Sequence, residues 1–251
     1  MSDQQYHTGG MRAVTMSREY GSGGGEVAAG VAQRLGWQLI DHEVVARVAE
    51  QLGISESDAA ARDERDESFV VRFLHSMRGI EPPALAVPTL PLPLDPYAYA
   101  TALREVVTGA AEAGRVVIVG RAGQVILRER RDALHVRVVT PFAQRIAYVM
   151  QREGLDHVAA ERRVRLKDQD RRQYMQNMFR CQPDDAHLYD LVLNTAVLDL
   201  ESCADLICRA LERKATRLTA PAEALGPAAG MPQYPGAPED LPVPHPPAEQ
   251  R

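Results

Sequence analysis

The sequence predicts an α/β fold in which helices cover both faces of a parallel sheet of about five strands. Short aliphatic stretches alternate along the chain with longer amphipathic stretches, which is the pattern of βαβ units. A glycine-rich turn joins the first aliphatic stretch to the helical pattern that follows it. The 251 residues are 45% hydrophobic, which suits one sizeable α/β domain with appendages rather than two full domains.

Short apolar runs that end in polar or glycine-containing turns are the expected strands. The clearest is RVVIVG at residues 115–120, because it is almost continuously aliphatic, as a strand buried on both faces should be. Right-handed crossovers should connect the strands. The expected strands are residues 12–17, 37–41, 115–120, 134–140 and 190–194.

Apolar residues at helical spacing fill the stretches between these strands. In residues 26–35, for example, Val27, Val31 and Leu35 fall on one stripe. Gly53 is expected to end the helix that follows the second strand. The expected helices are residues 26–35, 42–52, 58–77, 97–113, 142–153, 158–179 and 198–214.

We expect one folded domain over residues 11–213. Residues 1–10 are polar, lack the apolar segment of a signal peptide and are expected to be disordered. A variable insert is expected over about residues 54–99, because its part from 80 to 97 holds six of the chain's 17 prolines. Residues 214–251 are expected to form a disordered tail, since this proline- and alanine-rich stretch buries too little apolar surface to offset its ordering entropy.

The composition also disfavours several classes of function. No apolar run approaches the ~20 residues of a membrane helix, so no membrane partner is expected. A net charge of −5 and an aromatic content of 5% disfavour a nucleic-acid-binding module. Cys181, Cys203 and Cys208 lack metal-ligand spacing and are expected to be reduced thiols of a cytoplasmic protein. The histidines form no metal-like set, so no protein metal site is expected.

The most informative segment is TMSREYGSGGGEV at residues 15–27, where a strand passes through a turn directly into a helix. Successive N–H groups in such a turn form a concave anion site, and the helix N-terminus adds partial positive charge. Glycines let the backbone approach phosphate oxygens closely. A plain βα connection is the alternative, but Gly21, Gly23, Gly24 and Gly25 exceed what such a connection needs. The segment therefore predicts phosphate binding.

This turn departs from the standard phosphate loop, G-x-x-x-x-G-K-S/T. Gly24 or Gly25 stands where the lysine would be, and no serine or threonine follows. Arg18 is placed to supply cationic charge from the front of the turn. The other nearby polar side chains are Ser17, Tyr20 and Ser22.

The segment SREYGSGG resembles the opening motif of the cytidylate-kinase-like family, within the P-loop nucleoside monophosphate kinase superfamily. Further similar segments follow in order and together extend over about residues 12–210: LIDHEVV at 39–45, VVIVGRAGQVIL at 116–127, RIAYVMQREG at 145–154, the D-x-x-R-x-x-Y of Asp168, Arg171 and Tyr174, and YDLVLNT at 189–195.

The resemblance implies a three-layer α/β/α P-loop kinase-like fold with a helical lid over about residues 150–182. It also implies ATP-dependent phosphoryl transfer to a nucleoside monophosphate, with CMP as the acceptor. ATP and Mg²⁺ would be the cofactors, with Mg²⁺ bridging the phosphates. The partners would then be nucleotides.

Candidate site residues follow from position and from this resemblance. Asp41 and Arg121 lie at the carboxyl ends of expected strands, where ligands of open α/β sheets gather; with Asp168 and Tyr174 they are the expected acceptor-binding residues. Asp41 as a helix N-cap is an equal alternative. Expected cofactor-binding residues are Ser17, Gly21, Ser22, Gly23, Gly24 and Gly25. The expected catalytic cations are Arg18, Arg121 and the lid residues Arg163, Lys167 and Arg171.

Two positions depart from the pattern of the family. Gly25 stands where the family usually has a basic residue, and Ala122 stands where cytidylate kinases commonly have an acid. Together with the missing lysine, these positions leave a second interpretation open. It is a non-catalytic nucleotide-binding or regulatory protein on the same fold.

Overall fold

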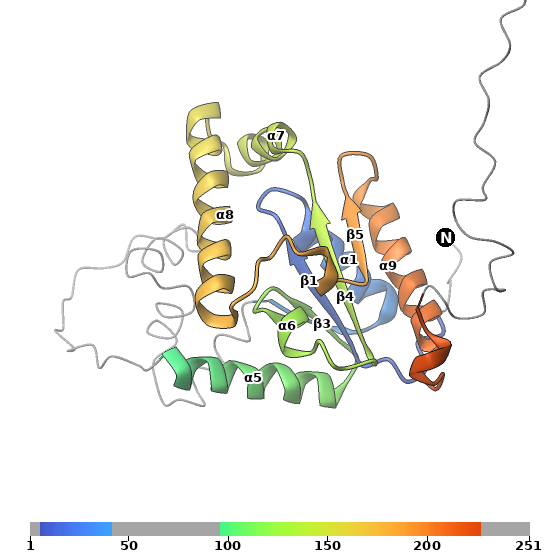
Figure 1. The fold of residues 1–251 in the computed structure, drawn as a ribbon. Coiled ribbons are helices and arrows are strands. Elements are labelled where there is room, and N and C mark those ends of the chain that lie inside the picture. Colours follow the sequence, from blue (N-terminus) through green and yellow to red (C-terminus); the bar gives the residue numbers. More distant parts are fainter. Residues whose placement is uncertain (1–5, 42–95, 227–251) are drawn as a thin grey trace, which may run out of the picture. The chain divides into compact units, whose positions relative to one another are not determined.

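The computed structural model describes residues 6–41 and 96–226. Its centre is a sheet of five parallel strands, as predicted, and the structure gives their order as β2-β3-β1-β4-β5 (Figure 1). The helices expected over 42–52 and 58–77, and most of the proline-rich insert, lie outside the described residues. The strands are β1 (Ala13–Arg18), β2 (Gln38–Ile40), β3 (Val116–Val119), β4 (Ala133–Val139) and β5 (Leu191–Asn194).

Helices cover both faces of this sheet, which confirms the three-layer α/β/α prediction. On one face, α1 (Gly24–Leu35) and α9 (Leu200–Ala215) pack against each other and against the sheet. On the other face lie α5 (Pro96–Ala113) and the short α6 (Gly123–Ile126). The four-residue helix α6 was not predicted, because so short a stretch shows no helical period.

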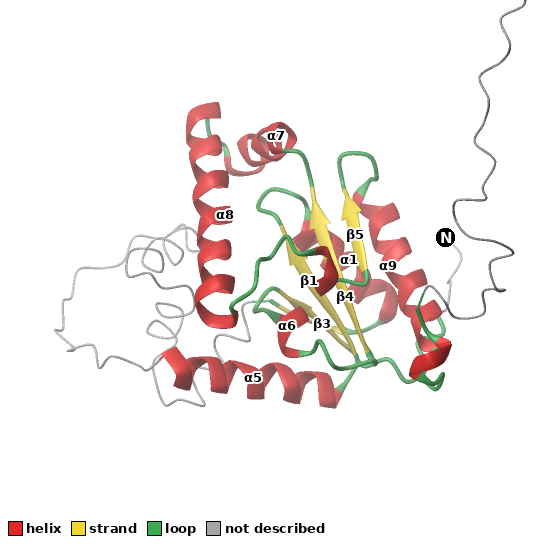
Figure 2. Cartoon of the chain, viewed as in Figure 1, coloured by secondary structure: helices red, strands yellow, loops and turns green. Residues whose placement is uncertain are grey.

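Two further α-helices of the described residues, α7 (Phe142–Glu153) and α8 (His157–Phe179), form a pair with a small core of their own. Asp156 begins α8 by accepting a hydrogen bond from the Ala159 N–H at 2.8 Å. Figure 2 shows the arrowheads of β1 and β4 pointing toward this pair. The carboxyl edge of the sheet therefore faces α7 and α8. The candidate functional site described below lies between this edge and the two helices.

The two central strands carry different side chains on their two faces. One face belongs to the core under α1 and α9 and is apolar up to Arg18 at the end of β1, with Val14, Met16, Leu134 and Val136. The opposite face, toward α6, carries four buried polar residues, Thr15, Ser17, His135 and Arg137. Thr15 Oγ1 lies 2.7 Å from His135 Nδ1, so one polar pair is closed inside the sheet face. Ser17 and Arg137 lie further along the same face, toward the carboxyl edge of the sheet.

Both expected disordered ends are partly ordered. Tyr6 packs against the core under α9 and donates a hydrogen bond to Asp205 Oδ1 at 2.5 Å. At the other end α9 runs to Ala215, and Leu218 packs against the same core. The disorder prediction therefore failed for residues 6–10 and 214–218, because a local composition argument does not see long-range packing. Residues 219–226 belong to a separate unit that includes the 3₁₀ turn Ala222–Ala224.

No helix in residues 6–41 and 96–226 is both long and apolar enough to cross a membrane. Cys181, Cys203 and Cys208 all carry free thiols.

Candidate functional site

The glycine-rich turn runs from the end of β1 at Arg18 to the start of α1 at Gly24. Gly21 and Gly23 have φ angles of 81° and 73°, which lie in the left-handed region that favours glycine. No side chain caps the N-terminus of α1. Among the described residues, no hydrogen bond engages the N–H of Gly24 or Gly25. The N-terminus of α1 is therefore open to an anion.

The four glycines of the turn are not equivalent. A Cβ at Gly23 would lie 2.6 Å from Leu200 Cδ2, and a Cβ at Gly21 would lie 2.9 Å from the Arg145 carbonyl oxygen. A Cβ at Gly24 would lie 2.6 Å from Arg18 Cβ, whereas one at Gly25 would meet nothing within 4 Å. A side chain at any of these three positions would thus meet other parts of the chain, and Gly21 and Gly23 are favoured in addition by their left-handed φ angles. Gly25 alone among the four opens onto free space.

The contact between Gly24 and Arg18 gives a steric reason why position 24, one of the two possible lysine positions, holds no lysine. The stem of Arg18 occupies the space that a side chain at position 24 would need. From there its guanidinium reaches Gly120, where an added Cβ would lie 2.6 Å from Arg18 Nη1. Arg18 Nη2 also lies 3.3 Å from Asp41 Oδ1. Arg18 therefore joins the start of α1 to the carboxyl ends of β2 and β3.

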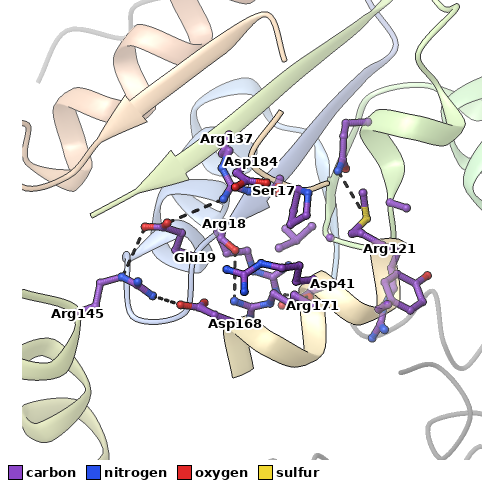
Figure 3. Close-up of a pocket in the computed structure, with 18 residues that line it drawn as sticks. Ser17, Arg18, Glu19, Asp41, Arg121, Arg137, Arg145, Asp168, Arg171 and Asp184 are labelled. Carbon is purple, nitrogen blue, oxygen red and sulfur yellow. Dashed lines mark hydrogen bonds and ion pairs between the residues drawn. The ribbon is translucent and has the colours of Figure 1, made fainter. Parts of the chain in front are cut away.

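A cavity of about 190 Å³ lies at this edge of the sheet (Figure 3). Six arginines and four carboxylates line it, a formal excess of two positive charges (six minus four). An excess of positive charge in a cavity favours an anionic ligand. The arginines are Arg18, Arg121, Arg137, Arg145, Arg171 and Arg172, and the acids are Glu19, Asp41, Asp168 and Asp184.

Several of these charges hold the turn in place. Buried Arg145 pairs with Asp168, lies 3.5 Å from Glu19 Oε2 and donates to the Tyr20 carbonyl at 3.2 Å. Asp168 Oδ1 accepts the Tyr20 N–H at 3.1 Å, and Glu19 Oε2 accepts the Thr140 N–H at 3.0 Å. Asp168, expected to bind the acceptor, does line the cavity, but its carboxylate is already bonded to the turn.

The two serines expected at the cofactor are both engaged inside the protein. Arg137 Nη1 donates to Ser17 Oγ at 3.2 Å, and Tyr189 Oη lies 3.1 Å from the same oxygen. Ser17 therefore lies in a polar network that lines the large cavity. Ser22 is buried and donates to the Glu19 carbonyl at 2.9 Å. Both hydroxyl groups thus have hydrogen-bond partners within the protein.

Arg121 follows β3 in an unusual backbone conformation. Gly120, Arg121 and Ala122 have φ angles of 75°, 55° and 51°, so two non-glycine residues occupy the left-handed region. Such strain persists where the surroundings impose it, and it is frequent at functional sites. Burial lowers the pKa of the Arg121 guanidinium, and Arg171 acts in the same direction, while Tyr174 and Asp41 oppose them. A cation in this environment is stabilised strongly by an anionic ligand.

The structure brings only part of the expected lid set to the cavity. Arg171 lines it and donates to the Arg18 carbonyl at 3.3 Å. Tyr174 also lines it, with its ring centroid 5.8 Å from that of Phe179. Arg163 instead pairs with Glu153, and Lys167 is buried within α8; neither lines this cavity. Spacing along one helix face did not place all three cations at one site, because neighbouring elements cover part of that face.

A second cavity of about 180 Å³ lies against the turn itself. It is bounded by residues 18–26 of the turn and α1 and by side chains of α7, and Arg18, Glu19 and Arg171 line both cavities. The two cavities therefore meet at these three residues.

Five charged residues of the cavity were missed by sequence reasoning: Glu19, Arg137, Arg145, Arg172 and Asp184. Arg137 had a signal, because it is a charged residue within the mostly apolar segment LHVRVVT of an expected strand. Arg145 had no comparable signal, because charged residues are common in an amphipathic helix and the sequence does not show which of them are buried.

Nucleoside triphosphates and Mg²⁺ are the groups that the sequence resemblance implies, and the geometry fits them unequally. The open turn and the arginines fit phosphates. Within residues 6–41 and 96–226, no group of three or more His, Cys, Asp or Glu side chains is arranged to hold a metal. A Mg²⁺ ion here would therefore take its ligands mainly from phosphate oxygens and water.

Residues 13–197 match the model of the cytidylate kinase-like family. A crystal structure of an uncharacterized protein from Eubacterium ventriosum is similar to 80% of this chain and 99% of its own, with a TM-score of 0.59 and 19% identity. A shikimate kinase from Acinetobacter baumannii is more loosely similar, over 79% of this chain and 92% of its own, with a TM-score of 0.42 and 12% identity.

A curated uronate isomerase from Corynebacterium glutamicum is 29% identical over 111 residues. That stretch is 44% of this chain and 21% of the isomerase, so the chain spans about a fifth of that relative's length.

Proposed function

Because this chain belongs to the cytidylate kinase-like family, we propose that it catalyses ATP-dependent phosphoryl transfer to a nucleoside monophosphate, with CMP as the acceptor. One observation carries the proposal: the open N-terminus of α1 and the arginine-lined cavity meet at shared cationic residues. A donor phosphate bound at the turn would then lie next to an acceptor phosphate bound among the arginines. Adjacent sites of this kind are what a transfer between two phosphates requires.

The residues divide into donor, acceptor and junction groups. The N–H groups of Gly24 and Gly25 would bind the donor phosphates. Arg121, with its buried guanidinium, would bind the phosphate of the acceptor. Arg18 and Arg171 line both cavities and would contact the phosphoryl group as it passes between them. Their charge would stabilise the negative charge spread over the transition state.

Asp41 would act by positioning Arg18. Its carboxylate lies 3.3 Å from Arg18 Nη2, at the carboxyl end of β2, so it fixes the guanidinium at the junction of the two cavities. When bound with the nucleotide, Mg²⁺ would neutralise phosphate charge. The α7–α8 pair, as a lid, would exclude water on closing.

A second candidate is a nucleotide-binding protein that does not transfer phosphate. Two observations favour it. Position 24 has no room for the lysine of the standard loop, and Ala122 replaces an acid at the end of β3. On this reading the arginines bind nucleotides, and no chemistry follows.

The test is turnover with purified protein, ATP, Mg²⁺ and a panel of CMP, dCMP, UMP, AMP and GMP, with ADP release as the readout. The proposal predicts acceptor-dependent release that is fastest with CMP and is largely lost in Arg171→Ala. ATP binding without any acceptor-dependent release would support the second candidate. Absence of binding for every nucleotide would contradict both.

A further inference from the structure

We propose that Arg152 of α7 supplies to the donor phosphates the positive charge that a lysine at position 24 would otherwise supply. The inference rests on the proposed donor site at the turn, and it concerns a residue outside the arginine-lined cavity. Position 24 cannot hold a cation, because the stem of Arg18 fills the space. The Arg18 guanidinium is directed toward Asp41 and Gly120, at the junction with the larger cavity, so a cation that serves the turn alone has to come from another element.

The turn cavity places Arg152 in this role. Its cationic lining residues are Arg18, Arg152 and Arg171. Arg18 and Arg171 also line the larger cavity, whereas Arg152 lines the turn cavity and not the larger one. Arg152 is thus the cation of this cavity that is not shared with the acceptor side. Its side chain is 60% exposed, so it can turn toward a ligand without leaving a buried position.

Two neighbours orient the Arg152 guanidinium. It forms an ion pair with Glu26, in the first turn of α1, and it donates to Tyr148 Oη at 2.9 Å. It also lies 5.7 Å from the centroid of the Tyr148 ring. Tyr148 Oη donates to the same Glu26 carboxylate, so the three side chains bridge α7 and α1. These contacts hold the Arg152 guanidinium beside Glu26, the residue that follows Gly25.

Gly25 lines the same cavity as Arg152 and leaves room for a ligand on its side of the turn. A Cβ there would meet nothing within 4 Å, and no hydrogen bond of the described residues uses the Gly25 N–H. In the structure the carboxylate of Glu26 pairs with Arg152. A polyphosphate at the turn would offer more negative charge and a geometry that suits the planar guanidinium. Arg152 would then exchange part of its contact with Glu26 for phosphate oxygens.

An ordinary surface salt bridge is the competing explanation, and the chain contains a matched example. Arg165 of α8 is 65% exposed, pairs with Glu161 and lies 4.5 Å from the centroid of the Phe142 ring. It therefore has the same kinds of partner as Arg152 but lines neither cavity. Arg165→Ala is the control for Arg152→Ala.

The experiment is calorimetric titration of the full chain with ATP, AMP and inorganic tripolyphosphate, without turnover. Arg152→Ala should weaken ATP and tripolyphosphate binding by about tenfold to a hundredfold, while AMP binding changes little. Arg152→Lys should retain part of the affinity, and Arg165→Ala should bind all three like the wild type. Glu26→Gln breaks the same bridge but keeps the cation, so it should bind ATP at least as tightly as the wild type.

Three results would overturn the inference alone. The first is unchanged ATP binding in Arg152→Ala. The second is an equal loss of ATP affinity in Arg152→Ala and Glu26→Gln, and the third is an equal loss of ATP and AMP affinity in Arg152→Ala. Either of the last two would mean that the bridge acts only by holding α7 on α1. A wild-type protein that binds neither ATP nor tripolyphosphate would overturn the proposed function as well. Arg152-dependent polyphosphate binding without turnover would keep the inference and favour the non-catalytic candidate.

Discussion

Replacing two adjacent glycines by alanine separates packing from ligand binding at the turn. Gly24→Ala adds a methyl group 2.6 Å from Arg18 Cβ and 3.2 Å from Arg18 Cγ. Neither atom is the far end of a flexible chain, so Arg18 or the helix start must shift. Gly25→Ala adds the same methyl group one residue later, where nothing lies within 4 Å. Both residues are in the first turn of α1, so any gain in helix propensity is similar for the two variants.

The difference between the two variants is therefore mostly the cost of overpacking. Such insertions typically cost about 1–3 kcal/mol of unfolding free energy. In a domain of this size each kcal/mol shifts the melting temperature by about 2–4 °C, so Gly24→Ala should melt about 2–12 °C below Gly25→Ala. Thermal unfolding followed by circular dichroism measures this difference.

The same pair also tests the placement of Arg18. If the Gly24 methyl group displaces Arg18, Gly24→Ala should lose nucleotide affinity even at temperatures where it is fully folded. A Gly24→Ala variant that melts with Gly25→Ala and binds ATP normally would refute the contact, and with it the steric reason for the absent lysine.

Three further predictions concern other parts of the chain. Arg121→Ala should weaken CMP binding by about 1.5–3 kcal/mol in a calorimetric titration while the melting temperature stays nearly level, because Arg121 lines the cavity rather than the apolar core; unchanged affinity would count against phosphate contact. Burial, reinforced by Lys214 and opposed by Asp190, lowers the pKa of His135, so the unfolded chain binds the proton more tightly than the folded one. As the pH is lowered below about 6.5, the unfolding free energy measured in urea titrations should therefore decrease, by at most about 1.4 kcal/mol per pH unit. This dependence of the unfolding free energy on pH should be weaker in His135→Gln. Deleting residues 219–251 should leave the melting temperature nearly unchanged. Deleting residues 214–251 should lower it by several degrees, because the Lys214–Asp190 ion pair and the packing of Leu218 are lost. Equal melting temperatures of the two truncated chains would contradict this packing.

Much of the fold was predictable because its signals are local. The strand RVVIVG is continuously aliphatic, and β3 forms within it as a strand buried along its whole length. The expected helix over 142–153 has the bounds of α7, since its apolar spacing is regular and Gly154 ends it in the left-handed conformation. The glycine-rich turn was predicted between a strand and a helix and lies there.

The individual roles of the glycines were beyond the sequence. Gly23 is required by Leu200 and Gly21 by the Arg145 carbonyl, and both partners are far along the chain. A run of glycines indicates that the backbone has left-handed φ angles or that another group packs closely against it, but it does not identify that group. The expectation that all four glycines serve the ligand was therefore incomplete, and only the structure distinguished Gly25 from the others.

The sequence by itself determined the order of the strands and helices, the turn at the end of β1 and the abundance of arginine, because hydrophobic period and residue type act over short distances. The tertiary structure decided which charges meet. Arg145 reaches Asp168 and Glu19, while Lys167 is buried and Arg163 pairs with Glu153, away from the large cavity. These pairings depend on how α7 and α8 pack across the carboxyl edge of the sheet, and charge interactions between elements follow distance in space rather than separation in sequence.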